Sequence, residues 1–169
     1  IPGFLWAAAA AAAVLFLAAL LFPFGEDYPE PQVTGTDIIA EPERGSRLKT
    51  HDNTAELFLG GYCLVKLEQQ SEIVIKGSKY DEAVLLEKGR ITCTVNKNKG
   101  TFRVNSSVGT VSVTGTEFSV QVKPFQGKEG EWKERMSVEV FSGSVAIDSP
   151  LGTFELSRGE EVTLPKKPS

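Results

Sequence analysis

Residues 109–122 read GTVSVTGTEFSVQV, and this stretch decides the fold class. Valine or phenylalanine recurs at every second position in 111–113 and again in 118–122, with a Gly-Thr pair between the two runs. Because successive side chains of a strand point to opposite faces, this spacing predicts two half-buried β-strands. Gly115, which separates them, predicts a bulge or a close approach of neighbouring backbone.

The alternating pattern extends from Gly45 to Leu164. Turn-forming residues interrupt it about every 8 to 12 positions, which is typical of proteins built from many short strands. We therefore expect an all-β domain, a short-stranded antiparallel sandwich or a solenoid-like β domain, with no helix after Gly25. The expected strands are 55–59, 63–67, 71–76, 91–96, 102–104, 111–113, 118–122, 136–140, 145–147, 154–156 and 162–164.

Length and charge restrict the function classes. The chain has 169 residues, 24% of them charged, and a formal net charge of −4, which suits one domain of moderate size. A mildly acidic balance argues against nucleic acid as a partner. Cys63 and Cys93 are too few for a disulfide framework. Both cysteines lie on the same strand face as large apolar neighbours, which predicts that they point into the core. This pattern is compatible either with two buried free thiols or with a disulfide between them.

Nothing in the sequence predicts catalysis. The single histidine, His51, lies in the polar turn 50–53, and Glu160 and Glu161 follow a glycine turn. The sequence contains no GxSxG and no HExxH, the signatures of two common hydrolase classes. One histidine also excludes zinc sites that need several imidazoles. We expect a protein that is not an enzyme and has no metal or cofactor.

Residues 1–25 are expected to form one transmembrane helix. Positions 4–24 carry no charge, and their helix would span about 32 Å, enough for a hydrocarbon core of about 30 Å. The run is too long for a secretory signal peptide and ends in bulky residues. The first basic residue after it is Arg44, which suits the translocated side of a membrane. The anchor residues that we single out are Phe4, Trp6, Ala10, Leu17 and Phe22.

Residues 26–43 follow as an acidic, proline-containing linker. Six acidic residues and no basic one fall here, and its three prolines prevent a helix from continuing. One interpretation is a semi-extended spacer that lifts the domain off the bilayer. The other is that 33–40 already forms the first strand. In both cases 44–164 forms the β domain and 165–169 a tail.

One segment is a candidate partner contact. Residues 123–135 read KPFQGKEGEWKER, which predicts a loop of thirteen positions, whereas hairpin loops usually have about two to five residues. Phe125 and Trp132 would be costly to leave in water, so they either fold back on the domain or contact a partner. For docking, Trp132 is the best candidate anchor, with Phe125 second and Arg135 as the charged neighbour.

Ordered stretches between Gly45 and Leu164 resemble the FecR domain. They include a glycine-led opening, a central block in which 113–120 reads VTGTEFSV, and a closing Leu-x-x-Gly-Glu piece. The stretches are 45–50, 55–59 and 71–75, then 86–91, 102–106 and 109–120, then 138–145 and 156–162. The motif residues, which we interpret as structural, are Gly109, Gly115, Thr116, Phe118 and Gly143.

The resemblance implies a single-pass protein of the bacterial inner membrane with its β domain in the periplasm. FecR-type proteins often regulate sigma factors by passing a receptor's signal through one transmembrane helix to a cytoplasmic anti-sigma segment. The sequence shows neither that segment before Ile1 nor a receptor-facing domain after Leu164. We therefore expect an accessory or scaffold subunit of a larger membrane complex, whose partners are the lipid bilayer and other membrane proteins. A FecR-type signal relay, seen as a fragment, is the alternative.

Overall fold

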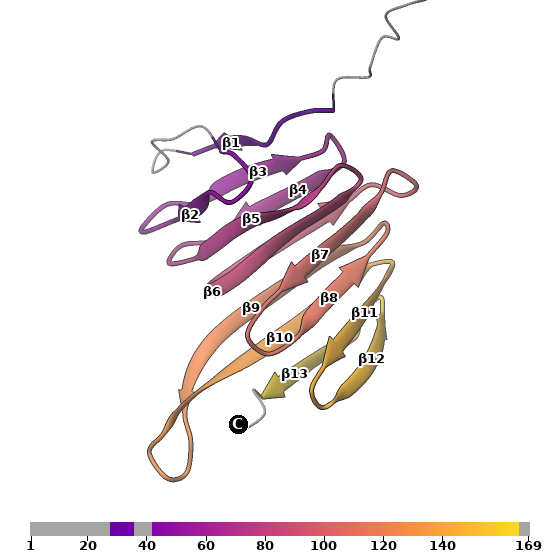
Figure 1. Ribbon diagram of the computed structural model, residues 1–169. Coiled ribbons are helices and arrows are strands. Elements are labelled where there is room, and N and C mark those ends of the chain that lie inside the picture. The colour runs from indigo at the N-terminus through magenta and orange to yellow at the C-terminus, as the bar shows by residue number, and fades with distance from the viewer. Residues whose placement is uncertain (1–27, 36–41, 166–169) are drawn as a thin grey trace, which may run out of the picture.

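The computed structural model describes residues 28–35 and 42–165. Every regular element in these residues is a β-strand, which confirms the all-β prediction (Figure 1). The strands are β1 (Gln32–Thr34), β2 (Arg47–Lys49), β3 (Ala55–Leu59), β4 (Cys63–Leu67), β5 (Glu72–Ser78), β6 (Asp81–Val95), β7 (Thr101–Asn105), β8 (Thr110–Val113), β9 (Glu117–Gln126), β10 (Trp132–Ser142), β11 (Ser144–Ser149), β12 (Gly152–Ser157) and β13 (Glu161–Pro165).

The described ranges hold no helix of the length and apolarity that a membrane crossing requires. The predicted span 4–24, with its anchor residues Phe4, Trp6, Ala10, Leu17 and Phe22, lies outside those ranges. The transmembrane helix therefore stays a prediction.

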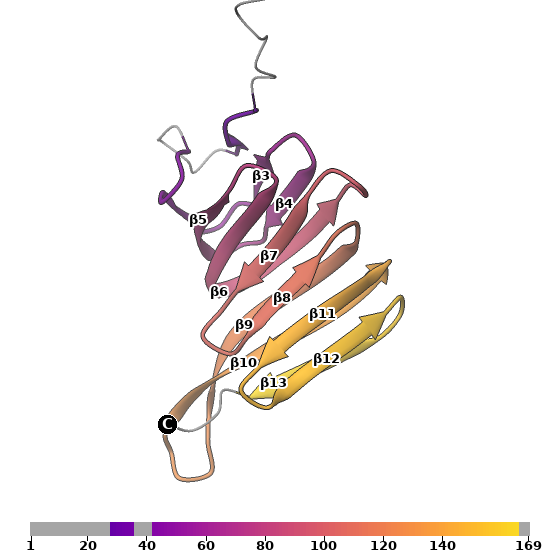
Figure 2. The same ribbon diagram turned by 45° about the vertical axis from the view of Figure 1, so that its right-hand side comes forward.

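The strands form two layers that face each other across one core (Figures 1 and 2). The first, here called the β7 layer, has the order β2-β5-β6-β7-β8-β11-β12. The second, the β9 layer, has the order β1-β3-β4-β6-β9-β10-β13. β6 belongs to both layers, because its first half pairs with β5 and β7 and its second half with β4 and β9.

The crossing of β6 from one layer to the other requires a change of side-chain parity. Val84 and Leu86 face the core from the first half, whereas Ile91 and Cys93 face it from the second. The register with β5 shifts at this point, so that Glu87 is inserted as an extra residue. One inserted residue moves every later side chain to the opposite face, and the core therefore stays continuous through the corner.

The prediction of short, antiparallel strands is wrong in two respects. β6 has 15 residues, β9 has 10 and β10 has 11. In addition, β6 and β7 are parallel, from the pair Asp81 and Thr101 to the pair Leu85 and Asn105, so the sheet is mixed. The length of β6 and its parallel pairing with β7 have one cause. β6 ends in the β9 layer, and residues 96–100 return the chain to the start of β6 in the β7 layer.

The alternating apolar residues form the core as the sequence predicts. Phe118 in the β9 layer packs against Phe102 in the β7 layer with ring centroids 6.5 Å apart, and both side chains are fully buried. Cys63 and Cys93 are buried and unbonded, so the free-thiol alternative holds. Burial raises the pKa of both thiols, which keeps them protonated and unreactive at neutral pH.

The predicted linker is in part structured. Gln32–Thr34 form β1, which pairs with β3 at the edge of the β9 layer. Of the predicted strand 33–40, only residues 33–34 are observed in β1, Gly35 lies outside the strand, and Val33 packs against the core. The remainder of the predicted strand, 36–40, lies outside the described residues.

Candidate functional site: the aromatic hairpin and the Glu82 cluster

The motif glycines lie where backbone segments approach each other closely. A Cβ atom on Gly115 would come within 2.8 Å of the Cα atom of Lys97, and one on Gly109 within 2.7 Å of the carbonyl oxygen of Asp148. Gly143 has a φ of +82° and packs on the carbonyl of Gly115. Only glycine fits such contacts without displacing the neighbouring strand.

The other two motif residues link the layers. The Thr116 hydroxyl donates a hydrogen bond of 2.7 Å to the carbonyl of Ser144, at the start of β11 in the opposite layer. Phe118 is the β9 residue that packs against Phe102. The Gly-Thr block therefore joins the two layers at one corner. The Thr116 hydroxyl is used in a hydrogen bond within the domain, and the Phe118 ring is used in core packing.

The segment 123–135 is a hairpin and not a thirteen-residue loop. β9 continues to Gln126 and β10 begins at Trp132, so only 127–131 connects them. Cross-strand pairing extends to Gln126 and Trp132, which a count of polar residues does not reveal. Figures 1 and 2 show this hairpin projecting beyond the two layers. We call 123–135 the aromatic hairpin.

The aromatic hairpin extends past its neighbouring strands. Within the described residues, the last pair of β9 with β6 is at Val122, and the last pair of β10 with β13 is at Arg135. Residues 124–126 and 132–134 therefore pair only with each other. Near the base of the hairpin, the Ser107 hydroxyl donates a hydrogen bond to the Glu134 carboxylate and ties β10 to the β7–β8 turn.

The structure separates the three candidate partner-contact residues. Phe125 lies under the guanidinium of Arg135, which is 3.8 Å from its ring centroid, so these two residues satisfy each other through a cation–π contact. Trp132 is 73% exposed. Phe125 is therefore covered within the hairpin itself, whereas Trp132 presents its indole to solvent.

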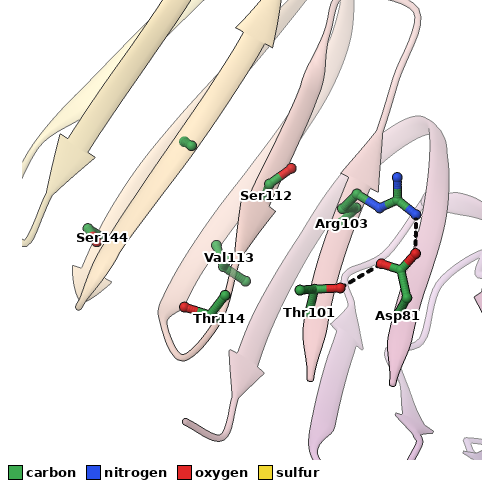
Figure 3. Close-up of a pocket in the computed structure, with 8 residues that line it drawn as sticks. Asp81, Thr101, Arg103, Ser112, Val113, Thr114 and Ser144 are labelled. Carbon is green, nitrogen blue, oxygen red and sulfur yellow. Dashed lines mark hydrogen bonds and ion pairs between the residues drawn. The ribbon is translucent and has the colours of Figure 1, made fainter. Parts of the chain in front are cut away.

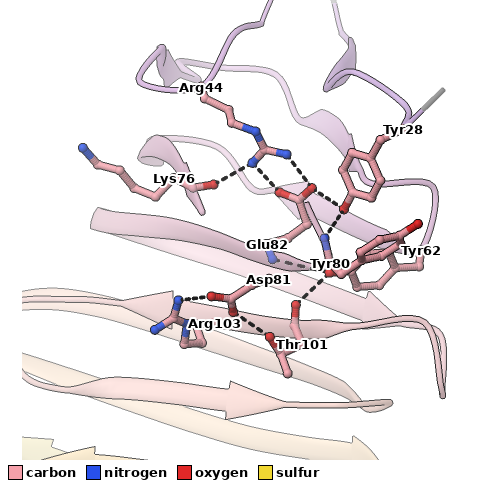
Figure 4. Close-up of polar contacts among 9 residues, drawn as sticks. All are labelled: Tyr28, Arg44, Tyr62, Lys76, Tyr80, Asp81, Glu82, Thr101 and Arg103. Carbon is pink, nitrogen blue, oxygen red and sulfur yellow. Dashed lines mark hydrogen bonds and ion pairs between the residues drawn. The ribbon is translucent and has the colours of Figure 1, made fainter. Parts of the chain in front are cut away.

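A second candidate site was not predicted from the sequence and centres on Glu82. This residue lies at the start of β6 and its side chain is fully buried. Arg44 donates two hydrogen bonds of 2.7 Å, one to each carboxylate oxygen, and Tyr28 donates one of 2.7 Å (Figure 4). A buried carboxylate is stable only when paired and hydrogen-bonded, and here both partners come from the predicted linker or its boundary.

We define the Glu82 cluster as Tyr28, Arg44, Tyr62 and Glu82. Two of its members are aromatic, and a further aromatic residue, Tyr80, packs against it. The Tyr28 hydroxyl accepts a hydrogen bond of 3.0 Å from the backbone N–H of Tyr80, and the two rings pack edge to face at 5.1 Å. Tyr62 donates to the carbonyl of Thr101 at 2.8 Å. Burial, reinforced by Glu82, raises the pKa of Tyr28, and the hydrogen bond to Glu82 raises that of Arg44.

The cluster could have been suspected from one local signal. Glu82 has the same parity as Val84 and Leu86 in the run DEAVLL, so the strand pattern places an acidic side chain on the apolar face. Such a residue needs a cation from elsewhere in the chain. The sequence pattern does not identify which cation, since Arg44 is 38 positions away.

A shallow polar groove lies on the outer face of the β7 layer, next to the cluster. It encloses about 480 Å³ and is lined by small side chains such as Ser112 and Ser144. At one end, Asp81 accepts hydrogen bonds of 2.6 Å from Arg103 and from Thr101 (Figure 3). The charges of Asp81 and Arg103 neutralise each other within the groove. The described part of the chain also contains no cluster of three or more potential metal ligands.

Comparisons with known proteins identify one family and a similar fold. The FecR family (FecR protein) matches residues 46–146. Two crystal structures of a candidate anti-sigma factor from Parabacteroides distasonis ATCC 8503, at 1.65 and 2.50 Å resolution, are each 20% identical with a TM-score of 0.55. Each match covers 72% of this chain and 60% of that protein. No curated protein matches. The family match spans more than half of the sequence, and the chain belongs to the FecR family.

Proposed function

We propose that this protein is a FecR-type signal-relay regulator that controls a sigma factor. The observation that carries the proposal is the family match over 46–146. The fold shared with a candidate anti-sigma factor agrees with it. Family and fold both support a regulatory protein that is not an enzyme.

The accessory-subunit prediction is the weaker of the two. It rested on the absence of relay segments around the β domain, and neither the family match nor the fold likeness supports a scaffold in a membrane complex. In the relay, residues 4–24 form the membrane anchor and the β domain lies outside the cytoplasm. The basic-free flank after the apolar run supports this orientation.

The aromatic hairpin is the part of the β domain that we assign to partner contact. Trp132 is the most exposed of the large hydrophobic residues in the described ranges, and exposed tryptophans are enriched among the residues that dominate protein interfaces. Arg135 and Phe125 stiffen the base of the hairpin through their stacked contact. We therefore infer that a protein partner packs on Trp132.

The test is transcription in the source bacterium. The gene is deleted and complemented with wild type or with Trp132→Ala, and transcripts are compared genome-wide. A relay predicts that deletion changes one coherent set of promoters and that Trp132→Ala shifts the same set. Phe141→Ala is the matched control, because Phe141 is an exposed aromatic residue of the same strand outside the hairpin.

A different result would refute the relay. If deletion leaves transcription unchanged while the tagged protein purifies with a stoichiometric set of membrane proteins, the accessory-subunit role is correct. If Trp132→Ala and Phe141→Ala behave alike while deletion alters transcription, the relay stands and the partner surface lies elsewhere.

A further inference from the structure

The buried charge of Glu82 depends on residues that precede the family match, which begins at residue 46. Its carboxylate receives hydrogen bonds from Tyr28 and Arg44. Tyr62, the nearest polar side chain of the domain proper, hydrogen-bonds backbone groups instead of the carboxylate. Removing Tyr28 and Arg44 would leave Glu82 buried without the hydrogen bonds that offset its desolvation.

The region before the domain is attached at two points around this carboxylate. β1 pairs with β3 in the β9 layer. Arg44 also donates to the carbonyl of Lys76, 3.2 Å away, and the next residue, Gly45, donates to the carbonyl of Ile75 at 2.8 Å in the β7 layer. Tyr28 and Arg44 therefore approach Glu82 from different sides, as Figure 4 shows.

This attachment sets the reach between the predicted anchor and the domain. Tyr28 lies four positions after Phe24, the end of the predicted span. Four extended residues reach at most about 14 Å. If Tyr28, β1 and Arg44 detached, the first fixed point would be Gly45, which lies 21 positions after Phe24 and corresponds to a maximum of about 70 Å.

We propose that the Glu82 cluster is a latch that holds β1 and Tyr28 on the β domain and so couples the domain closely to its membrane anchor. With the latch closed, a displacement of the domain reaches the anchor through a short connection. With the latch open, the connection is slack and the displacement is lost. This role rests on the proposed relay function, whereas the latch itself is a property of the fold.

The latch is tested by hydrogen–deuterium exchange on the full chain in detergent micelles. Glu82→Gln retains the volume of the side chain and removes its charge, and Tyr28→Phe removes a single hydrogen bond. We expect both variants to increase exchange in β1 by roughly tenfold to a hundredfold, the range that loss of a hydrogen bond to a charged group implies. Exchange in β9 and β10 stays at the wild-type rate.

Glu72→Gln is the matched control. Glu72 lies on β5 and is bridged by Arg47, Lys49 and Lys88, none of which belongs to the Glu82 cluster. This variant should leave β1 exchange unchanged. The latch is refuted if β1 exchange stays within about twofold of wild type in both cluster variants. It is also refuted if β9 and β10 lose protection together with β1, since Glu82 would then support the whole core.

A reporter gene for the affected promoters separates the latch from the relay. If the cluster variants release β1 and change reporter output, both proposals are supported. If they release β1 and the output stays at the wild-type level, the latch exists but does not couple the domain to its anchor, whereas the relay itself is refuted only when deletion of the gene leaves transcription unchanged. The reporter result does not enter the exchange measurement, so the two failures are distinguishable.

Discussion

Trp132→Ala is expected to cost little stability although it removes the largest type of side chain. Trp132 is 73% exposed, so roughly 65 Å² of a side chain of about 250 Å² is buried. At about 25 cal/mol per Å², its loss lowers the free energy of unfolding by at most about 1.6 kcal/mol. Phe118, which is fully buried against Phe102, provides the comparison, because Phe→Ala in a core costs about 3–5 kcal/mol.

The assay is urea unfolding of residues 26–169, followed by circular dichroism, with wild type, Trp132→Ala and Phe118→Ala measured side by side. This range retains Tyr28 and β1. The two variants should differ by about 1.4 kcal/mol or more, with Phe118→Ala the less stable. If Trp132→Ala is as destabilising as Phe118→Ala, the indole is part of the core in solution. The assignment of the aromatic hairpin to partner contact would then be wrong.

Three further predictions concern the corner of β6, the acid side of the stability profile and the membrane anchor. Gly89→Ala should lower the free energy of unfolding, measured in urea, by about 2–5 kcal/mol. The reason is that φ of Gly89 is +91° and the new Cβ would lie 2.5 Å from the Cα of Ser71. A loss below about 1 kcal/mol would contradict this account of the corner. The hydrogen bond from Arg47 and the nearby lysines hold the pKa of Glu72 below its ordinary value of 4.5. The stabilisation that the Glu72 carboxylate provides is therefore complete above pH 4.5 and disappears as the pH falls through the lower folded-state pKa. At low salt, Glu72→Gln should therefore make the free energy of unfolding less dependent on pH in this acidic range. A pH dependence equal to that of wild type would contradict this account. Ala10→Arg should abolish stable membrane integration, since a central arginine costs about 2.5–3.5 kcal/mol on insertion scales; carbonate-resistant pelleting equal to wild type would show that the predicted span is wrong.

Local sequence pattern was sufficient for the fold class and for the inward faces of the strands. A residue's parity along a strand depends only on its near neighbours, so Phe118, Val138 and Ile147 could be placed in the core before any pairing was known. The sequence pattern also predicted that position 115 requires glycine, because two apolar runs meet there. The bonding state of Cys63 and Cys93 could not be predicted, because strand parity showed that both face inward and did not distinguish free thiols from a disulfide.

Contacts between distant residues required the tertiary structure. The parallel pairing of β7 with β6, the crossing of β6 between layers and the extension of β9 and β10 into a hairpin all depend on which strands become neighbours. The Glu82 cluster is the clearest case, because its carboxylate is satisfied from 38 and 54 positions away. Alternation records which side chains face the core. Alternation does not indicate which segments supply the hydrogen-bond partners of a buried charge, because these partners are determined by how the whole chain packs.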